Sequence, residues 1–186
     1  MAIQRYRPLS LLDELQREMN TLFHTPEKES SFNSEEWSPA VDISEDALAV
    51  ADINIKMHNL DKQVSTLISD CWQALEKQQQ YDLIISNPPY VGDLEMSSLP
   101  AEYHHEPVHA LQADDNGLAL VEQIITGAAT FLTPQGLLFV EVGNSDLAVD
   151  ERWPETHFLW LDLEQGGHGI FMLTQAQCAE FAAAYS

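Results

Sequence analysis

The sequence predicts an α/β fold built on a mostly parallel sheet that ends in an antiparallel hairpin. From Ala40 onward, short apolar runs alternate with helical patterns, which is typical of strand–helix–strand crossover units with helices on both faces of the sheet. The last two apolar runs, 157–163 and 169–174, are separated only by EQGGH. Because so short a segment cannot form a crossover, these two runs are expected to pair as a hairpin at one end of the sheet.

Each element is predicted from its own pattern of apolar residues. The expected strands are AVDIS (40–44), VSTLIS (64–69), DLIIS (82–86), GLLFVEVG (136–143), HFLWLDL (157–163) and GIFMLT (169–174). The expected helices cover EDALAVADINIKMH (45–58), CWQALEKQQQ (71–80), residues 116–132 and the segment from Gln175 onward.

The first 39 residues differ from the rest of the chain. Residues 9–23 carry apolar side chains at spacings of three and four, and Ser10 is a plausible N-cap, so one amphipathic helix is expected there. The following TPEKESSFNSEEWSPA is rich in Ser, Glu and Pro and resembles a linker. We therefore predict a helix and flexible linker over 1–39 and an α/β domain over 40–186.

Composition excludes several kinds of partner. The chain has 8 Lys+Arg against 30 Asp+Glu, a formal net charge of −22. Such a surface repels nucleic acid and attracts a basic partner, but the simplest interpretation is that the acidic residues only keep the surface soluble. The cysteines Cys71 and Cys178 form no C-x-x-C pair, so neither a disulfide framework nor a zinc site is expected.

No long apolar span and no secretory leader pattern is found, and a cytoplasmic protein is expected.

Three polar residues follow predicted strands. Asp42, Asp70 and Asn87 lie at or just past strand ends, where ligands bind in open α/β sheets. An acid in the position of Asp42 commonly accepts hydrogen bonds from ribose hydroxyls. The alternative is a capping role, since Asp42 or Ser44 could cap the helix at 45–58 and Asp70 the next one.

The motif Asn87-Pro88-Pro89-Tyr90 carries the most specific chemistry in the sequence. An amide nitrogen is a poor nucleophile because its lone pair is delocalised. The Asn87 side-chain oxygen and the Pro88 carbonyl can accept both N–H groups of such an amide, and proline fixes the backbone that holds them. Tyr90 adds a flat face for a planar substrate group. The alternative is a plain Pro-Pro turn that leaves a strand.

Two further patterns are weaker. His104, His105, Glu106 and His109 could suggest a metal site, but Pro107 breaks the helix that would place them on one face, and no metal is expected. The run Gly166-Gly167-His168-Gly169 lies between two strands and is better explained as a hairpin turn than as a phosphate cradle.

A family resemblance follows from several segments together. VDISEDALAVADINI, SDCW, YDLIISNPPYV, LPAEYHHEPVHAL, DDNGLALVEQII, GLLFVEVGNS and GGHGIFML resemble the later part of a class I S-adenosylmethionine-dependent methyltransferase of the HemK-like glutamine type. LPAEYHHEP and GGHGIFML are most similar to the branch that methylates a glutamine of a large-subunit ribosomal protein.

The resemblance implies a role for each candidate residue. Asn87, Pro88, Pro89 and Tyr90 would form the catalytic site and hold the glutamine amide. Asp42 would hold the cofactor ribose, the segment Asp70, Cys71 and Trp72 would lie near the adenine, and Asn87 would also border the cofactor. The implied substrate is a basic ribosomal protein.

The chain also departs from this family. The family places its first strand and a Gly-rich loop before the position of Asp42, whereas no glycine here precedes Gly92. A truncated class I (Rossmann-like) sheet is therefore expected, with the strands at 40–44 and 64–69 separated from the others, weak S-adenosylmethionine binding and impaired activity. RYRPLSLLDELQREMNTLF and EEWSPAVDISED resemble the N-terminal arm of a bacterial small heat-shock protein, so the chain resembles a chimera joined at AVDISED.

Two other functions remain open. One is a non-catalytic remnant or interaction protein that keeps the methyltransferase scaffold, and the other is a DNA amino-methyltransferase, which the acidic surface disfavours. Unpaired strand edges and apolar patches also predict a homo-oligomer.

Overall fold

The computed structural model of the chain describes residues 38–90, 117–161 and 168–185. The helix predicted at 9–23, most of the linker and the histidine-rich segment at 104–109 lie outside these ranges. So do residues 162–167, which include most of the predicted hairpin turn.

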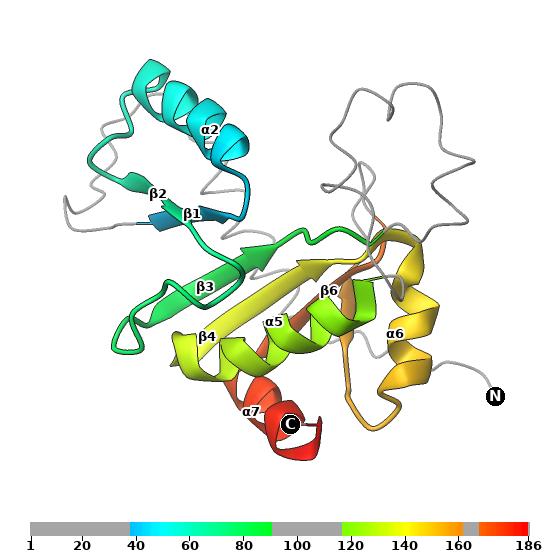
Figure 1. The fold of residues 1–186 in the computed structure, drawn as a ribbon. Coiled ribbons are helices and arrows are strands. Elements are labelled where there is room, and N and C mark those ends of the chain that lie inside the picture. The colour runs from blue at the N-terminus through cyan, green and yellow to red at the C-terminus, as the bar shows by residue number, and fades with distance from the viewer. Residues whose placement is uncertain (1–37, 91–116, 162–167, 186) are drawn as a thin grey trace, which may run out of the picture.

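The described chain alternates strands and helices (Figure 1). The strands are β1 (Ser38–Asp42), β2 (Val64–Ile68), β3 (Tyr81–Ser86), β4 (Leu132–Glu141), β5 (Leu159–Leu161) and β6 (Ile170–Thr174). The helices are α2 (Glu45–Met57), α5 (Leu118–Phe131), the short 3₁₀ turn η3 (Gly143–Ser145), α6 (Asp146–Arg152) and α7 (Gln175–Tyr185).

Every predicted strand is present, with ends that differ by up to four residues. The predicted helix at 71–80 is wrong, because this segment forms a series of turns. Cys71 has a φ of 47°, so it adopts a left-handed rather than a right-handed helical conformation. The helix α6 was not predicted, because its seven residues are too few to show a periodic pattern.

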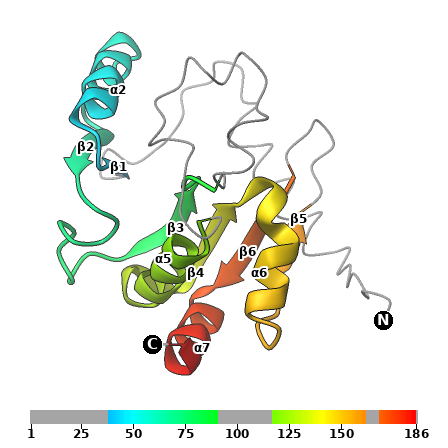
Figure 2. The same ribbon diagram turned by 45° about the vertical axis from the view of Figure 1, so that its right-hand side comes forward.

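The strands form two separate sheets. β1 and β2 make a parallel pair, and the other strands form a sheet in the order β3-β4-β6-β5. In the second sheet β3 is parallel to β4, whereas β4, β6 and β5 pair antiparallel, which confirms the predicted hairpin at one end. Within the described ranges no strand joins β1 to β3, as expected from the sequence. In both views β1, α2 and β2 stand apart on the β3 side of the larger sheet (Figure 2).

The main hydrophobic core lies between the four-stranded sheet and three helices. In Figure 2, α5, α6 and α7 lie on the same side of this sheet. The core comprises Leu118, Val121, Ile124, Ile125 and Ala128 of α5, Leu132, Leu138 and Val140 of β4, Val142, Val149 and Trp153, Phe171 and Leu173 of β6, and Cys178 and Phe181 of α7. The burial of these apolar side chains is the dominant stabilising contribution.

The opposite face of the four-stranded sheet is also apolar. Leu83 pairs in register with Leu137, and Ile85 pairs with Phe139, so these four side chains share that face. Leu83 is 49% exposed and Ile85 is 70% exposed. Helices were expected on both faces, but the helices of the described ranges cover only the face opposite these residues. The β3 end of this sheet thus presents apolar side chains to solvent.

Candidate functional site

The Asn-Pro-Pro-Tyr segment lies directly beyond the carboxyl end of β3, as predicted. Asn87 is exposed, Pro88 is buried, and Pro89 and Tyr90 are half-buried. Within the described residues no hydrogen bond is found for the Asn87 carboxamide. The buried proline anchors the segment while the amide oxygen that precedes it remains accessible to a ligand.

Three glycines form a seat beneath this segment, which we call the glycine seat. They are Gly117, before α5; Gly143, after β4; and Gly169, before β6, with φ values of 76°, 51° and 68°. Such left-handed backbone is costly for other residues. Each glycine therefore permits a backbone path that a side chain would oppose.

The glycine seat fits Tyr90 and Pro89 closely. A Cβ on Gly143 would lie 2.8 Å from Cζ of Tyr90 and still closer to Cε2, so the phenol ring rests directly on the glycine backbone. A Cβ on Gly117 would lie 2.6 Å from the carbonyl oxygen of Pro89. A Cβ on Gly169 would collide with the carbonyl of Gly143. The Tyr90 ring thus packs on the backbone of Gly143, which in turn packs on the backbone of Gly169.

Hydrogen bonds connect the Tyr90 segment and the two neighbouring strands around the glycine seat. The Ser145 hydroxyl donates to the Tyr90 carbonyl over a long 3.5 Å, and the Val142 N–H donates to the Gly169 carbonyl at 2.7 Å. These bonds join β4, the start of β6 and the Tyr90 segment at the same edge of the sheet.

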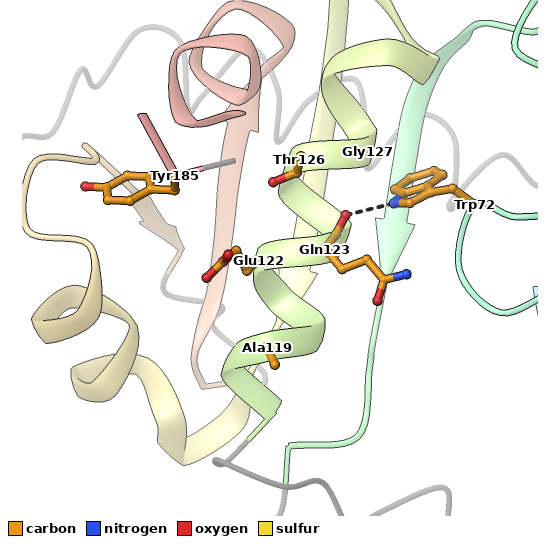
Figure 3. A pocket seen from close by; sticks show the side chains of 7 residues that line it. All are labelled: Trp72, Ala119, Glu122, Gln123, Thr126, Gly127 and Tyr185. Atoms are coloured by element: carbon orange, nitrogen blue, oxygen red, sulfur yellow. Dashed lines mark hydrogen bonds between the residues drawn. The ribbon is translucent and has the colours of Figure 1, made fainter. Parts of the chain in front are cut away.

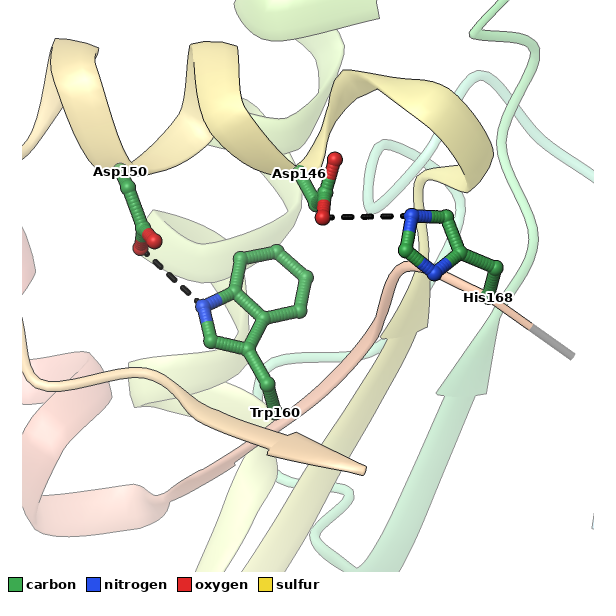
Figure 4. Close-up of polar contacts among 4 residues, drawn as sticks. All are labelled: Asp146, Asp150, Trp160 and His168. Atoms are coloured by element: carbon green, nitrogen blue, oxygen red, sulfur yellow. Dashed lines mark hydrogen bonds and ion pairs between the residues drawn. The ribbon is translucent and has the colours of Figure 1, made fainter. Parts of the chain in front are cut away.

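Helix α6 is fixed to the neighbouring strands by two side-chain contacts (Figure 4). The Trp160 indole N–H donates to the Asp150 carboxylate at 3.1 Å. His168 Nε2 lies 3.3 Å from Asp146 Oδ2, and forms an ion pair when the imidazole is protonated. These contacts hold the helix beside the glycine seat.

Asp42 and Asp70 follow the two strands of the smaller sheet. Asp42 is exposed, and its Oδ1 accepts the Ser44 N–H at 2.7 Å. Ser44 rather than Asp42 caps α2, since its side chain accepts the Ala47 N–H. Asp70 is also exposed and accepts from the Gln73 amide at 2.9 Å. Within the described residues, each of these two carboxylates accepts a hydrogen bond at only one of its two oxygens.

The turn that carries Asp70 is organised by Ser69, one of two buried polar residues among those described. Its backbone N–H donates to the Asp42 carbonyl at 2.9 Å, which joins the ends of β1 and β2. Its hydroxyl donates to the Cys71 carbonyl at 2.9 Å and accepts the Ala74 N–H at 3.0 Å. Burial, with a smaller effect of the Asp70 charge, raises the pKa of the Cys71 thiol, so this residue stays protonated at neutral pH.

A hollow of about 350 Å³ opens at the carboxyl ends of β1 and β2. Its lining residues are Ile43, Ile68, Ser69, Asp70, Gln73 and Ala74. Ile43 and Ile68 are 65% and 48% exposed, so two apolar side chains stand beside the carboxylate of Asp70. Apolar walls next to one hydrogen-bond acceptor suit a flat heterocycle that carries an amino group.

Trp72, in the turn that follows β2, packs on α5. Its indole stacks on Phe131 with ring centroids 5.0 Å apart, and its N–H donates to the Gln123 carbonyl at 3.0 Å (Figure 3). A Cβ on Gly127 would overlap the indole, so this glycine makes the close approach possible. A second hollow of about 400 Å³ lies along α5 and is lined by Trp72, Ala119, Glu122, Gln123, Thr126, Gly127 and Tyr185 (Figure 3).

The predicted site residues therefore fall into two groups. Asn87 to Tyr90 belong to the four-stranded sheet, whereas Asp42, Asp70 and Cys71 belong to the smaller sheet, and Trp72 packs on α5. Sequence reasoning missed the glycine seat, Ser69 and the apolar wall formed by Ile43 and Ile68. The available signals were Gly143 and Gly169 at the ends of two predicted strands, whereas Gly117 lay within a predicted helix.

Two observations concern other classes of site. Among residues 38–90, 117–161 and 168–185, no group of three His, Cys, Asp or Glu side chains is placed to hold a metal ion. In those same ranges, no helix has the length and apolarity needed to cross a membrane.

The sheet order and the polar residues at its strand ends define part of a class I, Rossmann-like methyltransferase fold. A solved structure supports this fold: the 16S rRNA N2 G1207 methyltransferase of T. thermophilus, in complex with AdoMet and guanosine. The two chains are 15% identical with a TM-score of 0.50, and the match covers 94% of this chain and 44% of that one. Residues 30–102 also match the family model of the methyltransferase small domain.

In sequence, the chain is a relative of the HemK-like protein-glutamine methyltransferases. It is 46% identical over 145 residues to the ribosomal protein uL3 glutamine methyltransferase of Francisella tularensis. It is 43% identical over 138 residues to the protein of that name from Neisseria gonorrhoeae. These matches cover 78% and 74% of this chain, and the chain spans 46% of the length of each relative. The resemblance to the glutamine methyltransferases noted in the sequence is thus confirmed, whereas the resemblance of the first residues to the arm of a small heat-shock protein stays a prediction.

Proposed function

We propose that this chain carries the substrate side of an S-adenosylmethionine-dependent methyltransferase that acts on a glutamine side-chain amide of a ribosomal protein. The observation that carries the proposal is the glycine seat, which fixes Tyr90 and Pro89 beside an accessible Asn87 carboxamide. The curated relatives are named for the same reaction on ribosomal protein uL3. A ribosomal substrate places the proposed reaction in the cytoplasm.

The proposed catalytic role belongs to four residues. The Asn87 side-chain oxygen and the Pro88 carbonyl accept the two N–H groups of the glutamine amide, which orients its nitrogen. Tyr90, held against Gly143, supplies a flat surface for the planar amide. Pro88 and Pro89 restrict the backbone, so the two acceptors are positioned before the substrate arrives.

S-adenosylmethionine supplies an electrophilic methyl group on a positively charged sulfur. The residues present fit the adenosine part of this cofactor. The hollow at the ends of β1 and β2 offers Ile43 and Ile68 to the faces of the adenine and the Asp70 carboxylate to its amino group. The unused oxygen of Asp42 is available to a ribose hydroxyl. Cys71 and Trp72 support this turn rather than touch the ligand.

We further propose that the affinity of this chain for the cofactor is low and that its methyl transfer is impaired. The two groups of site residues stand on separate sheets, and no glycine precedes Gly92 to let the backbone approach the rest of the ligand. One charge-assisted bond to Asp42 contributes about 1.5–3 kcal/mol. A loss of about 3–4 kcal/mol elsewhere moves a micromolar ligand towards the millimolar range, at about 1.4 kcal/mol per tenfold.

A titration calorimetry experiment with S-adenosylmethionine tests the cofactor proposal. No saturable binding is expected in the micromolar range, whereas saturation-transfer NMR should detect weak contact of the adenine protons. Asp70→Ala should remove that contact, and Asp61→Ala, which deletes an exposed charge before β2, should not. Micromolar affinity that Asp42→Ala abolishes would show that low affinity is the wrong conclusion.

The substrate proposal is tested with labelled S-adenosylmethionine and recombinant ribosomal protein uL3. Any transfer to a glutamine should fall by about 10²-fold or more in Asn87→Ala, because one N–H acceptor is lost from the transition state. Turnover that is unchanged by this substitution would overturn the assignment of Asn87. The net charge of −22 favours a basic protein substrate, so transfer should weaken as salt is added.

A second function is favoured by the divided sheet. An interaction protein that keeps the methyltransferase scaffold would need the exposed side of β3 rather than a closed cofactor site. Absence of both cofactor contact and methyl transfer in the two experiments above would support this alternative.

A further inference from the structure

Glu141, the last residue of β4, is the feature on which this inference rests. Exposure alternates along the end of this strand: Val140 and Val142 are buried in the core, whereas Phe139 and Glu141 are partly exposed. Because successive side chains of a strand point to opposite faces, Glu141 points to the face of the sheet that the described helices do not cover. It stands at the carboxyl end of β4, directly before the segment that enters the glycine seat.

Asn87, on the neighbouring strand, points to the same face. The parallel register sets Ser86 opposite Val140, so its next step places Asn87 beside Glu141. Ile85 and Asn87 are exposed and Ser86 between them is half-buried, so the alternation of β3 continues to Asn87. The proline that follows also favours an extended backbone there. The two side chains therefore share one face of two strands that run about 4.8 Å apart.

The Glu141 carboxylate makes neither a hydrogen bond nor an ion pair within the described part of the chain, where the one ion pair found joins His168 and Asp146. None of the lysines and arginines in that part neutralises it. The groups beside it, the Asn87 side-chain oxygen and the Pro88 carbonyl, are acceptors too. An unpaired carboxylate beside two neutral acceptors creates a negative potential, which favours a ligand that brings positive charge to this edge.

We infer that Glu141 is a specificity-determining residue, which binds a lysine or arginine side chain of the substrate next to the glutamine that Asn87 holds. The inference rests on the proposed function and deepens it, because it names a chemical feature of the substrate around the target amide. The net charge of −22 attracts any basic protein over a long range, whereas Glu141 selects for a cation at the site itself.

A second cation that approaches this edge under the proposed function is the sulfonium of S-adenosylmethionine. The strand order favours the substrate instead. The proposed cofactor residues Asp42 and Asp70 belong to the smaller sheet, which stands on the β3 side of the larger one (Figure 2). Glu141 lies on the opposite side of Asn87, in β4. The carboxylate is therefore placed towards the substrate rather than towards the methyl donor.

NMR chemical-shift titrations of the full chain with short peptides test the inference. The probes are acetyl-Gly-Arg-Gln-Gly-amide and acetyl-Gly-Gln-Arg-Gly-amide, and each has a counterpart in which citrulline, a neutral isostere, replaces arginine. At least one arginine probe should bind about threefold to tenfold more tightly than its counterpart. Glu141→Gln should reduce this preference to below about twofold, which is the coupling that a double-mutant cycle measures.

Glu180→Gln is the matched control. It changes the net charge by the same amount, and Glu180 is exposed on α7, on the opposite side of the sheet (Figure 2). The preference for arginine should be the same in this variant as in the parent chain. Glu141→Asp keeps the charge on a shorter side chain and should retain more of the preference than Glu141→Gln. Added salt should weaken the arginine probes more than the citrulline probes.

The outcomes separate this inference from the proposed function. If Asn87→Ala weakens the binding of all probes but the preference for arginine is absent, or persists in Glu141→Gln, the inference is wrong and the proposed function stands. Loss of the saturation-transfer signal of S-adenosylmethionine in Glu141→Gln would also refute the inference, because the carboxylate would then serve the sulfonium. If no glutamine probe binds, or if binding is the same in Asn87→Ala, the proposed function fails and this inference fails with it.

Discussion

Substitution of Gly143 by alanine tests the glycine seat directly. The backbone at this position has a φ of 51°, and left-handed backbone costs a residue with a Cβ about 1–2 kcal/mol. The added Cβ would also overlap the edge of the Tyr90 ring. Overpacking of this kind typically costs about 1–3 kcal/mol. The two effects together predict a loss of roughly 2–5 kcal/mol in the free energy of unfolding.

A double-mutant cycle separates these two contributions. Tyr90→Leu removes the ring that the new Cβ would strike but leaves the backbone conformation of Gly143 unchanged. In that background Gly143→Ala should cost only the backbone part, so the coupling between the two positions should be about 1–3 kcal/mol. Urea unfolding followed by far-ultraviolet circular dichroism measures each corner of the cycle.

Two outcomes would refute this reasoning. If Gly143→Ala lowers the free energy of unfolding by less than about 0.5 kcal/mol, its effect is that of an ordinary surface substitution. That result would mean that the Tyr90 ring does not rest on the glycine. A loss of the expected size that is the same with and without Tyr90 would mean that backbone strain alone limits this position. The glycine seat would then have no part in orienting the tyrosine.

Three further predictions concern packing and titration. Gly127→Ala should displace the Trp72 indole and lower stability by about 1–3 kcal/mol, with loss of near-ultraviolet circular dichroism. Ser69→Ala should cost about 1–3 kcal/mol in urea unfolding through its two lost hydrogen bonds, whereas the control Ser65→Ala in β2 should cost less. Burial raises the pKa of the Cys178 thiol from 9.0 to about 12. Because the unfolded thiol ionises first, stability should decline between pH 9 and 12, and less steeply in Cys178→Ala.

Local patterns predicted most of the chain's elements and the placement of the Asn-Pro-Pro-Tyr segment after β3. Apolar runs fixed six strands, and the proline pair indicated that β3 ends at Ser86. The helix expected at 71–80 failed because its helix-forming residues are overridden by a tertiary contact. The Trp72 indole packs on Phe131, and the left-handed Cys71 directs the chain there. Such a contact involves residues 59 positions apart, which no local pattern records.

The glycine seat was beyond sequence reasoning for a related reason. Gly117, Gly143 and Gly169 come from three separate connections, and each looks like an ordinary turn residue when considered alone. Their common role emerges only when the sheet order brings these connections to one edge. The divided sheet, by contrast, was predictable, because the resemblance identified which strand position this sequence does not show.

The separation of the two sheets bears on catalysis more than on recognition. Each half of the site is organised by its own contacts: Ser69 shapes the turn of Asp70, and the glycine seat shapes the segment of Tyr90. Rapid methyl transfer requires the two halves to be held within about 0.5 Å of a productive geometry. Among the described residues, the contacts of Trp72 with α5 tie the Asp70 turn to the larger sheet, and one aromatic stack with one hydrogen bond is a small restraint for that purpose. Under the proposed function, we therefore expect recognition of adenine and of an amide to survive while the rate of transfer between them falls.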